Sequence, residues 1–338
     1  MKIIYGLRRI GDPYRKCVLT TGVFDGVHLG HRAIIKEAVA RALKLGRKST
    51  VITFDLGVKK ILECPGGRLC SPGVLLSTVE EKIRLIKSLG VDLLCIIKFS
   101  KRFSRISAGD FIKELVLSFD PLQIVAGQNH TFGKDGRGNS VLLEKLGRKY
   151  GFRSVVLNLR KAAASTTVNS TRIRSLVKKG NVQKANILLG RRFFIEGTVI
   201  KGRGVGGKLG FPTANLEVDP VKLVPGSGVY ACEIRSGSSS YGGAVNIGLR
   251  PTFERSSRSP RKSAKHTVEI HIMGFSGMLY GKKIKVSFIE KVRKERKFRD
   301  AETLKRQIEL DLIKIKGILG VSQKCHPRKE YSKGGMIW

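Results

Sequence analysis

The sequence predicts two domains: an α/β domain with a parallel sheet, followed by a small antiparallel β-barrel closed by a helix. The 338 residues are 41% hydrophobic and 27% charged, which is enough apolar side chain for two buried cores. Strand-like and helix-like segments alternate up to about residue 157, whereas strands with Gly, Pro and Ser turns dominate after residue 194. We therefore expect domains at residues 1–185 and 186–320, and a basic tail at residues 321–338.

The first domain is expected to contain short apolar strands with helices between them. The strands are the segments 17–24, 50–54, 91–99 and 122–127, and the helices are the segments 33–45, 80–90 and 108–119. Strands that are apolar along their whole length are typical of a parallel sheet with helices on both faces. The expected fold is Rossmann-like, with ligands bound at the carboxyl ends of the strands.

The second domain begins after a helical segment at 175–190 and has a different pattern. Its strands are expected at 193–202, 228–235, 241–248, 267–275 and 282–292. Short strands separated by turn residues are typical of a small antiparallel barrel. An amphipathic segment at 301–315 is expected to form the helix that closes the barrel.

Composition limits the class of protein. No run of about 18 apolar residues occurs and the first residues lack a signal-peptide pattern, so we expect a cytoplasmic protein without a membrane span. The six cysteines form no C-x-x-C pair, which argues against disulfides and zinc. The formal net charge is +39, but the basic residues are spread along the chain, so we expect anionic nucleotide substrates and no specific nucleic-acid binding. The sequence carries no signal for an oligomeric state.

The segment after the first of these strands has the pattern of a phosphate site. It reads GVFDGVHLGH at 22–31, and its glycines allow the backbone to approach a ligand closely. His28 and His31 lie three residues apart at the entrance of a helix, whose amino end favours a phosphate. A mere capping role for the histidines is the alternative. Their place in the first turn of a parallel sheet favours a triphosphate site.

This segment resembles the H-x-G-H signature of the nucleotidyltransferase superfamily, and TGVFDGVHLGHRAII is similar to the form in bacterial FAD synthetases. VNSTRIR at 168–174 resembles the second motif of that module. The resemblance implies that the phosphate of FMN attacks the α-phosphate of ATP, that His28 and His31 stabilise the developing charge, and that pyrophosphate leaves. The implied contacts to ATP are Gly22, Phe24, Asp25, Gly26, Gly30, Ser170, Thr171, Arg172 and Arg174.

A second glycine-rich segment, GRGVGGKL at 202–209, is a near match to a P-loop. Leu209 stands where a P-loop has Ser or Thr and no apolar helical pattern follows, so we reject both a P-loop and a Rossmann fingerprint. Thr213 and Asn215 follow in a PTAN segment, two residues apart in an extended chain, which points their side chains the same way. Their oxygens suit Mg²⁺, and an ordinary turn is the alternative.

The segments from GTVIKGRGVGGKLGFPTANL to VRKERKF occur in the order found in riboflavin kinases. Together with the first module, they make the chain similar to bacterial bifunctional riboflavin kinase/FAD synthetases over about residues 15–315. The resemblance implies that Glu269, which we expect on the inward face of its strand, takes the proton of the ribityl hydroxyl. We expect His271 to be structural. The remaining implied contacts are Gly202, Gly204, Gly207 and Lys208 with ATP, and Asn129, Arg293 and Phe298 with the flavin.

Several positions depart from the family pattern. In the first module they are Gly57, Asn129 in place of an acidic residue, His130 in place of Phe and Asn169 in place of Ser. In the second module they are Gly207, Gly274 in place of Asp and Met278 in place of an acidic residue. Gly207 replaces an Arg that the family has in this glycine-rich segment, 202–209. Arg203 or Lys208 can supply the missing positive charge. Because Thr213, Asn215 and Glu269 are present, we expect the kinase to be active.

The expected function is ATP- and Mg²⁺-dependent synthesis of flavin cofactors: phosphorylation of riboflavin to FMN, then adenylylation of FMN to FAD. The expected partners are these small-molecule substrates. One alternative is a basic nucleic-acid-binding protein with an H-x-G-H module, since the signature also occurs in aminoacyl-tRNA synthetases. The other alternative is the same family with one inactive domain.

Overall fold

The computed structural model describes residues 1–56, 74–158, 168–202, 210–251 and 264–320. The chain forms two compact units, which divide between Ile173 and Arg174. Our expected boundary after residue 185 lies 12 residues further along (185 − 173), inside helix α8 (Val182–Leu189), and it stays a prediction. Each unit is described by itself below.

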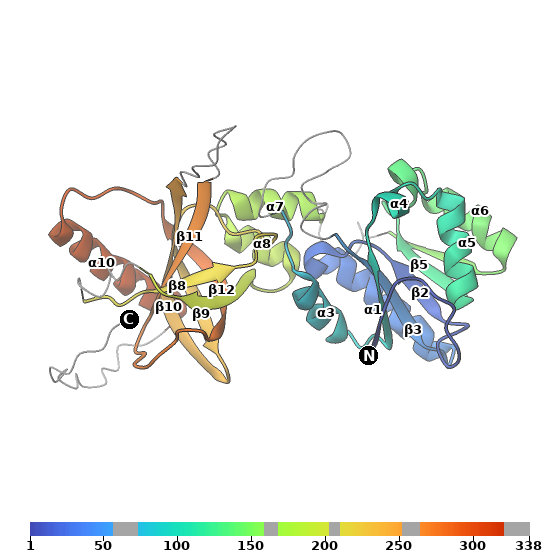
Figure 1. Ribbon diagram of the computed structural model, residues 1–338, viewed down its shortest axis with the longest axis horizontal. Coiled ribbons are helices and arrows are strands. Elements are labelled where there is room, and N and C mark those ends of the chain that lie inside the picture. Colours follow the sequence, from blue (N-terminus) through green and yellow to red (C-terminus); the bar gives the residue numbers. More distant parts are fainter. Residues whose placement is uncertain (57–73, 159–167, 203–209, 252–263, 321–338) are drawn as a thin grey trace. The chain divides into compact units, whose positions relative to one another are not determined.

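The first unit is built on a sheet of six strands, in the order β1-β4-β3-β2-β5-β6, and every neighbouring pair is parallel. Figure 1 labels its strands β2, β3 and β5. The expected Rossmann-like sheet is therefore confirmed. The edge strands β1 and β6 and the helix α6 (Ser140–Tyr150) were not predicted. The strands are β1 (Lys2–Tyr5), β2 (Val18–Thr21), β3 (Ser49–Asp55), β4 (Leu93–Lys98), β5 (Gln123–Gly127) and β6 (Arg153–Leu157).

Helices cover both faces of this sheet because successive side chains of each strand point to opposite faces. Val51 and Leu94 pack with helices α1 (Leu29–Lys44) and α3 (Val79–Lys87). Ile52 and Leu93, one residue away on the same strands, pack on the other side with α5 (Ala108–Phe119) and α6. Three of these helices have side-chain N-caps. Thr78 caps α3 in a capping box with Glu81, Ser107 caps α5 and Asn139 caps α6.

The strand order reverses beside β2, and this fixes where a ligand can bind. The chain runs from β2 to β3 and β4 in one direction, then returns to β5 on the other side of β2. In such sheets the crevice outside the carboxyl ends of the strands at the reversal is the usual ligand site. The histidine segment follows β2 directly, and Asn129 and His130 follow β5.

The second unit contains a closed barrel of six strands in the order β10-β11-β8-β7-β12-β9, and all its pairs are antiparallel. The predicted barrel is confirmed. The helical segment at 175–190 is two helices, because Gly180 with φ +76° interrupts it. The elements are α7 (Ser170–Lys178, which begins in the first unit), α8, β7 (Phe194–Ile200), β8 (Ala214–Val218), β9 (Gly228–Ser236), β10 (Ser239–Pro251), β11 (Ala264–Ile272), β12 (Lys283–Arg293) and α10 (Ala301–Leu319).

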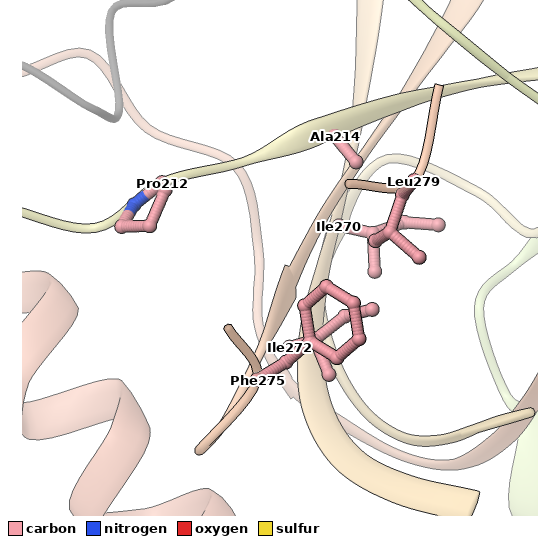
Figure 2. A pocket seen from close by; sticks show the side chains of 6 residues that line it. All are labelled: Pro212, Ala214, Ile270, Ile272, Phe275 and Leu279. Atoms are coloured by element: carbon pink, nitrogen blue, oxygen red, sulfur yellow. The ribbon is translucent and has the colours of Figure 1, made fainter. Parts of the chain in front are cut away.

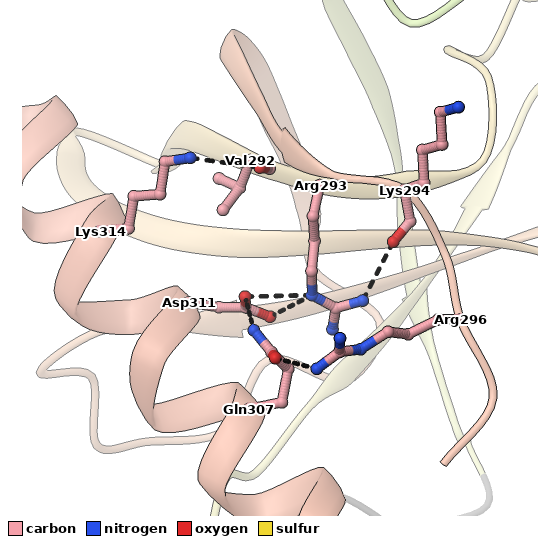
Figure 3. A network of polar contacts seen from close by, with 7 residues as sticks. All are labelled: Val292, Arg293, Lys294, Arg296, Gln307, Asp311 and Lys314. Atoms are coloured by element: carbon pink, nitrogen blue, oxygen red, sulfur yellow. Dashed lines mark hydrogen bonds and ion pairs between the residues drawn. The ribbon is translucent and has the colours of Figure 1, made fainter.

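The helix α10 is held on the barrel by a buried ion pair (Figure 3). Nε of Arg293, at the end of β12, donates to both carboxylate oxygens of Asp311 at 3.0 and 2.8 Å. The Asp311 side chain is 6% exposed and also accepts from Gln307 Nε2 at 2.7 Å. The Arg293 guanidinium further donates to the carbonyl of Lys294. Ile315 adds an apolar contact, since it packs in a buried cluster with Val229 and Val292.

We expect Asp311→Asn to lower the free energy of unfolding of the second unit by about 3 kcal/mol, because it leaves the Arg293 charge without its buried partner. The matched control is Glu302→Gln, which breaks the exposed Glu302–Arg306 pair of the same helix, where the side chains are 74% and 76% exposed. That change should cost about 0.5 kcal/mol or less. Urea denaturation followed by circular dichroism measures both. Equal losses in the two variants would refute the structural role of the Arg293–Asp311 pair.

Candidate active sites

The turn that joins β2 to α1, residues 22–28, has an unusual backbone. Phe24 and Val27 have φ of +48° and +40°, and Gly26 has φ of +75°. A positive φ is rare for bulky side chains and is an outlier for a β-branched one. Such strain persists only where surrounding contacts determine the conformation, and it is concentrated at functional sites.

Buried polar contacts hold this β2–α1 turn. The Asp25 side chain accepts hydrogen bonds from the backbone N–H groups of Leu76 and Ser77 at 2.9 and 3.2 Å. The Ser77 hydroxyl accepts from Gly26 N at 2.9 Å. Residues 76–77 lie just before α3, and sequence reasoning missed their contribution. The signal that marks this segment is the capping box of Thr78 and Glu81, which fixes where α3 begins.

Two of the predicted phosphate contacts support the turn instead. Phe24 is 2% exposed, and its ring packs edge to face against His31 with centroids 5.2 Å apart. The Asp25 carboxylate is 3% exposed and would repel a phosphate. These two side chains therefore support the turn, and the ATP contacts expected at positions 24 and 25 stay predictions.

His28 and His31 come together as the helical spacing predicts. Their rings are stacked with centroids 3.5 Å apart and an angle of 19° between the planes. His28 is the N-cap of α1, and its Nδ1 accepts a hydrogen bond from the backbone N of His31 at 3.3 Å. The capping role is thus real. Because Nδ1 accepts, the neutral ring carries its proton on Nε2, which is then a donor.

Electrostatics keep His31 neutral. Burial lowers the pKa of His31 well below its ordinary value, and the nearby charges of His28 and Lys82 lower it further. A neutral imidazole holds one N–H donor and one acceptor. The pair therefore offers directional hydrogen bonds to an oxyanion at the amino end of α1, where the backbone N–H groups also favour negative charge.

The distal motif reaches the same turn. The Ser170 hydroxyl donates to the carbonyl oxygen of Asp25 at 3.1 Å, which joins residues 145 positions apart. Asn169 departs from the usual Ser, but its Oδ1 accepts from the backbone N of Arg172 at 2.8 Å, so it serves as a cap of α7. Thr171 and Arg172 are exposed at the start of this helix, and Arg174 follows one turn along.

The segment after β5 carries two of the family departures. Asn129 is exposed in the turn, and a flavin contact from it stays a prediction. The His130 ring is stacked near Phe132, with centroids 5.6 Å apart and 23° between the planes. Burial lowers the pKa of His130 to about 4, so the ring is neutral near pH 7. A neutral, stacked imidazole occupies the place of the expected Phe and conserves its flat shape.

In the barrel, the register places Glu269 directly opposite Asn215 on β8 and directly opposite Asn246 on β10. Paired residues of neighbouring strands point to the same face, with Cβ atoms about 5 Å apart. The three side chains therefore form one row across β10, β11 and β8. Asn246 was not predicted as a site residue, because only the pairing of strands brings it beside Glu269.

This row lies on the outer face of the barrel, which corrects one expectation. Val268 and Ile270, the neighbours of Glu269, are 3% and 1% exposed and point into the core. Side chains alternate along a strand, so Glu269 points the other way, and its half-buried carboxylate escapes most of the cost of burial. The expected inward face is therefore wrong.

The PTAN segment is fixed beside this row. His271 Nδ1 donates to the carbonyl oxygen of Pro212 at 2.9 Å, which agrees with the structural role expected for His271. Gly202 packs so closely on Asn215 that a Cβ at position 202 would lie 1.9 Å from Nδ2, but 3.6 Å from Oδ1. The amide nitrogen thus faces Gly202. The oxygen lies further from Gly202 and can serve as a ligand.

A small apolar pocket lies on the inner side of the same strands (Figure 2). Its lining is Pro212, Ala214, Ile270, Ile272, Phe275 and Leu279. It has room for about one water molecule, since its cavity volume is about 10 Å³. A flavin does not fit in this pocket, so it is no candidate for the substrate site.

Other predicted site residues fall in three groups. Gly57, Gly204, Gly207 and Lys208 lie outside the described residues. Residues 210–218 form a turn, an extended segment and β8, so no helix follows the glycine-rich segment there and the rejected P-loop stays rejected. Gly274 (φ +67°) and Met278 (64% exposed) lie in the turn after β11. Arg293 is engaged by Asp311, and it stacks with Arg296 on the Phe298 ring, so flavin contacts from Arg293 and Phe298 stay predictions.

Comparison with known families agrees with both modules. The FAD synthetase family model matches residues 12–172, and the riboflavin kinase family model matches residues 189–319. Both candidate sites lie inside these ranges, except that Arg174 falls two residues beyond the first range. Among the described residues, no helix has the length and apolar character to cross a bilayer.

Relatives match nearly the whole chain. A bifunctional riboflavin kinase/FMN adenylyltransferase of Bacillus subtilis is 34% identical over 89% of this chain and 92% of its own length. A protein of the same name from Escherichia coli K12 is 31% identical, over 96% and 99%. A solved structure described as a macrolide-efflux protein from Streptococcus pneumoniae shares the fold with a TM-score of 0.80 and 27% identity, over 93% and 98%. With two domain matches in one chain and full-length relatives, this protein belongs to the family of bifunctional riboflavin kinase/FMN adenylyltransferases.

Proposed function

We propose that this chain phosphorylates riboflavin to FMN in its second unit and adenylylates FMN to FAD in its first. The observation that carries the proposal is the presence of a separate polar site in each unit. The stacked histidines at the amino end of α1 suit a triphosphate, and the row of Asn215, Glu269 and Asn246 suits a hydroxyl group. A chain with one inactive domain is disfavoured, because both sets of side chains are present.

In the first unit, the FMN phosphate attacks the α-phosphorus of ATP and pyrophosphate leaves. No protein nucleophile is needed, so the protein contributes positioning and charge neutralisation. His28 and His31 donate hydrogen bonds to the α-phosphate as negative charge develops on it. Backbone N–H groups at the start of α1 bind the same oxygens. Thr171, Arg172 and Arg174 bind the phosphates that become pyrophosphate.

In the second unit, the Glu269 carboxylate takes the proton of the terminal ribityl hydroxyl as the hydroxyl oxygen attacks the γ-phosphorus of ATP. The bond between that phosphorus and the oxygen bridging to the β-phosphate breaks, and ADP leaves. A half-buried carboxylate that keeps access to solvent can exchange the proton that it takes, which suits a base. Asn246 lies on the opposite side of Glu269 from Asn215 in the row, where its amide can orient the same hydroxyl.

Mg²⁺ fits beside this row. Thr213 and Asn215 offer a hydroxyl and an amide oxygen, which are hard ligands, and Mg²⁺ takes few protein ligands alongside substrate phosphates. When bound, the ion would neutralise phosphate charge during transfer. The Gly202 contact orients the Asn215 oxygen for this purpose.

Two further expectations belong to the proposal. The +39 charge attracts the nucleotide and flavin phosphates in general, and we propose no specific nucleic-acid partner. A cytoplasmic location also stays a prediction. It is supported by the proposed substrates, because ATP and riboflavin are available in the cytoplasm. The family models that cover both domains favour flavin synthesis over the alternative of a nucleic-acid-binding protein.

His31→Ala is expected to lower FAD formation about 10²–10³-fold, because the α-phosphate loses a preorganised donor. FMN should still accumulate from riboflavin, since the second unit is unchanged. Chromatographic separation of the flavins after incubation with riboflavin, ATP and Mg²⁺ measures both products. Unchanged FAD output would remove the histidine pair from the phosphate site.

Glu269→Gln is expected to lower riboflavin phosphorylation on the order of 10²–10⁴-fold, because it keeps the shape of the side chain and removes the base. Supplied FMN should still become FAD at the normal rate. The matched control is Glu217→Gln, an exposed carboxylate on neighbouring strand β8, which should change neither rate. If Glu269→Gln phosphorylates riboflavin normally, Glu269 is not the base, and joint loss of both activities would contradict two independent sites.

Gly202→Ala is expected to raise the Mg²⁺ concentration needed for riboflavin phosphorylation, because the new methyl group displaces the Asn215 amide. The control is Gly317→Ala in α10, where a Cβ would meet no atom within 4 Å. Titration of the initial rate with Mg²⁺ compares the two variants. An unchanged Mg²⁺ requirement in Gly202→Ala would argue against Asn215 as a ligand.

A further inference from the structure

Helix α3 buries a lysine that the proposed chemistry does not use. Lys82 is 4% exposed, although a lysine is almost never fully buried without a partner. It takes an inward position on the same face of the helix as Ile86, where an apolar residue would be expected. Burial of an ammonium group costs free energy unless the group is paired and hydrogen-bonded. The contacts of Lys82 therefore indicate its role.

Those contacts lead to the β2–α1 turn. Lys82 Nζ donates to the carbonyl oxygen of Phe54 at 2.9 Å and lies 3.4 Å from the Thr53 hydroxyl. The Thr53 hydroxyl donates to the carbonyl oxygen of Val23 at 3.0 Å. The ammonium group is therefore two hydrogen bonds from the backbone of the turn that carries the histidine pair. In addition to these hydrogen bonds, the backbone N–H of Gly22 donates to the carbonyl oxygen of Ile52 at 3.1 Å, which ties the β2–α1 turn to β3.

Lys82 interacts electrostatically with titratable groups on three elements. Asp25 lies on the β2–α1 turn, Asp55 at the end of β3, and His31 on α1. Burial lowers the pKa of Lys82 to about 8, and the two carboxylates oppose this shift. Lys82 is thus mostly charged at pH 7. Its charge in turn contributes to the lowered pKa of His31.

We propose that Lys82 is a positioning residue for adenylyl transfer: its buried ammonium group fixes the β2–α1 turn through Thr53 and adds a positive charge beside His31, which favours binding of the triphosphate. The inference rests on the proposed function of the first unit. The charge comes from Lys82 and the directional donors come from the histidines. The site therefore attracts an anion without a change in the protonation of His31.

The first test removes or retains the charge. Lys82→Met keeps the length of the side chain, and it should raise the KM for ATP in FMN adenylylation about 10- to 100-fold, the range for a lost hydrogen bond to a charged group. Lys82→Arg keeps the charge and should stay within about tenfold of the wild type. Riboflavin phosphorylation by the same samples controls for folding and for active protein.

The second test is the pH dependence of kcat/KM for ATP, which a purely structural role would not alter. In the wild type the ammonium group is charged below pH 8 and neutral above it, so kcat/KM for FMN adenylylation should fall as the pH rises above about 8. In Lys82→Arg the guanidinium stays charged, and this fall should disappear. Lys82→Met should be low throughout and show no fall. Riboflavin phosphorylation over the same pH range corrects for effects on ATP itself.

The outcomes distinguish a failure of the proposed role of Lys82 from a failure of the proposed function of the first unit. A wild type whose kcat/KM does not fall above pH 8 would overturn the role of Lys82, whatever the variants do. A fall that persists unchanged in Lys82→Arg, or wild-type KM in Lys82→Met, would overturn it as well. If the wild type made no FAD from FMN at any pH, the proposed function of the first unit would fail, and not the inference about Lys82 alone.

Discussion

Backbone strain in the β2–α1 turn is the constraint on which the first unit depends. Phe24 and Val27 hold positive φ values that cost of order 1–3 kcal/mol each, so the conformation survives only if the surroundings enforce it. Leu76 and Ser77 bind the turn from a segment about 50 residues away in sequence, through Asp25 and Gly26, and Ser170 binds it from the distal motif. The sheet brings these segments together, and the strained turn then presents two stacked histidines at a helix amino end.

The barrel solves a different problem, the placement of polar groups from separate strands in one row. Antiparallel pairing sets Asn246, Glu269 and Asn215 side by side without any helix or loop. The neighbours of these residues fill the barrel interior, so a slip of the register by one residue would turn the row into the core. The same apolar packing that stabilises the barrel therefore fixes the site. The α10 helix strengthens this arrangement through Arg293 and Asp311 at the end of β12.

Much of this could be predicted from the sequence, because apolar periodicity specifies the strands and short motifs specify the turns. The existence of β2, the limits of α5, the barrel and the pairing of His28 with His31 all follow from local patterns. The face on which Glu269 lies could not be predicted in this way. The alternation of side chains along a strand shows which residues share a face, but it does not show which face points into the barrel. Asn246, Ser77 and Lys82 were missed because their roles depend on contacts between segments far apart in the chain, which no local pattern records.

The central claim is that the two half-reactions use separate sets of residues, those of the β2–α1 turn and helix α7 for adenylyl transfer and those of the barrel for phosphorylation. A complementation experiment tests it most directly: the purified Glu269→Gln and His31→Ala proteins are incubated with riboflavin, ATP and Mg²⁺, separately and mixed in equal amounts. If the sites are independent, FMN released by the His31→Ala protein is adenylylated by the intact first unit of the Glu269→Gln protein, so FAD forms rapidly in the mixture only. A mixture that makes no more FAD than either protein alone would contradict the claim.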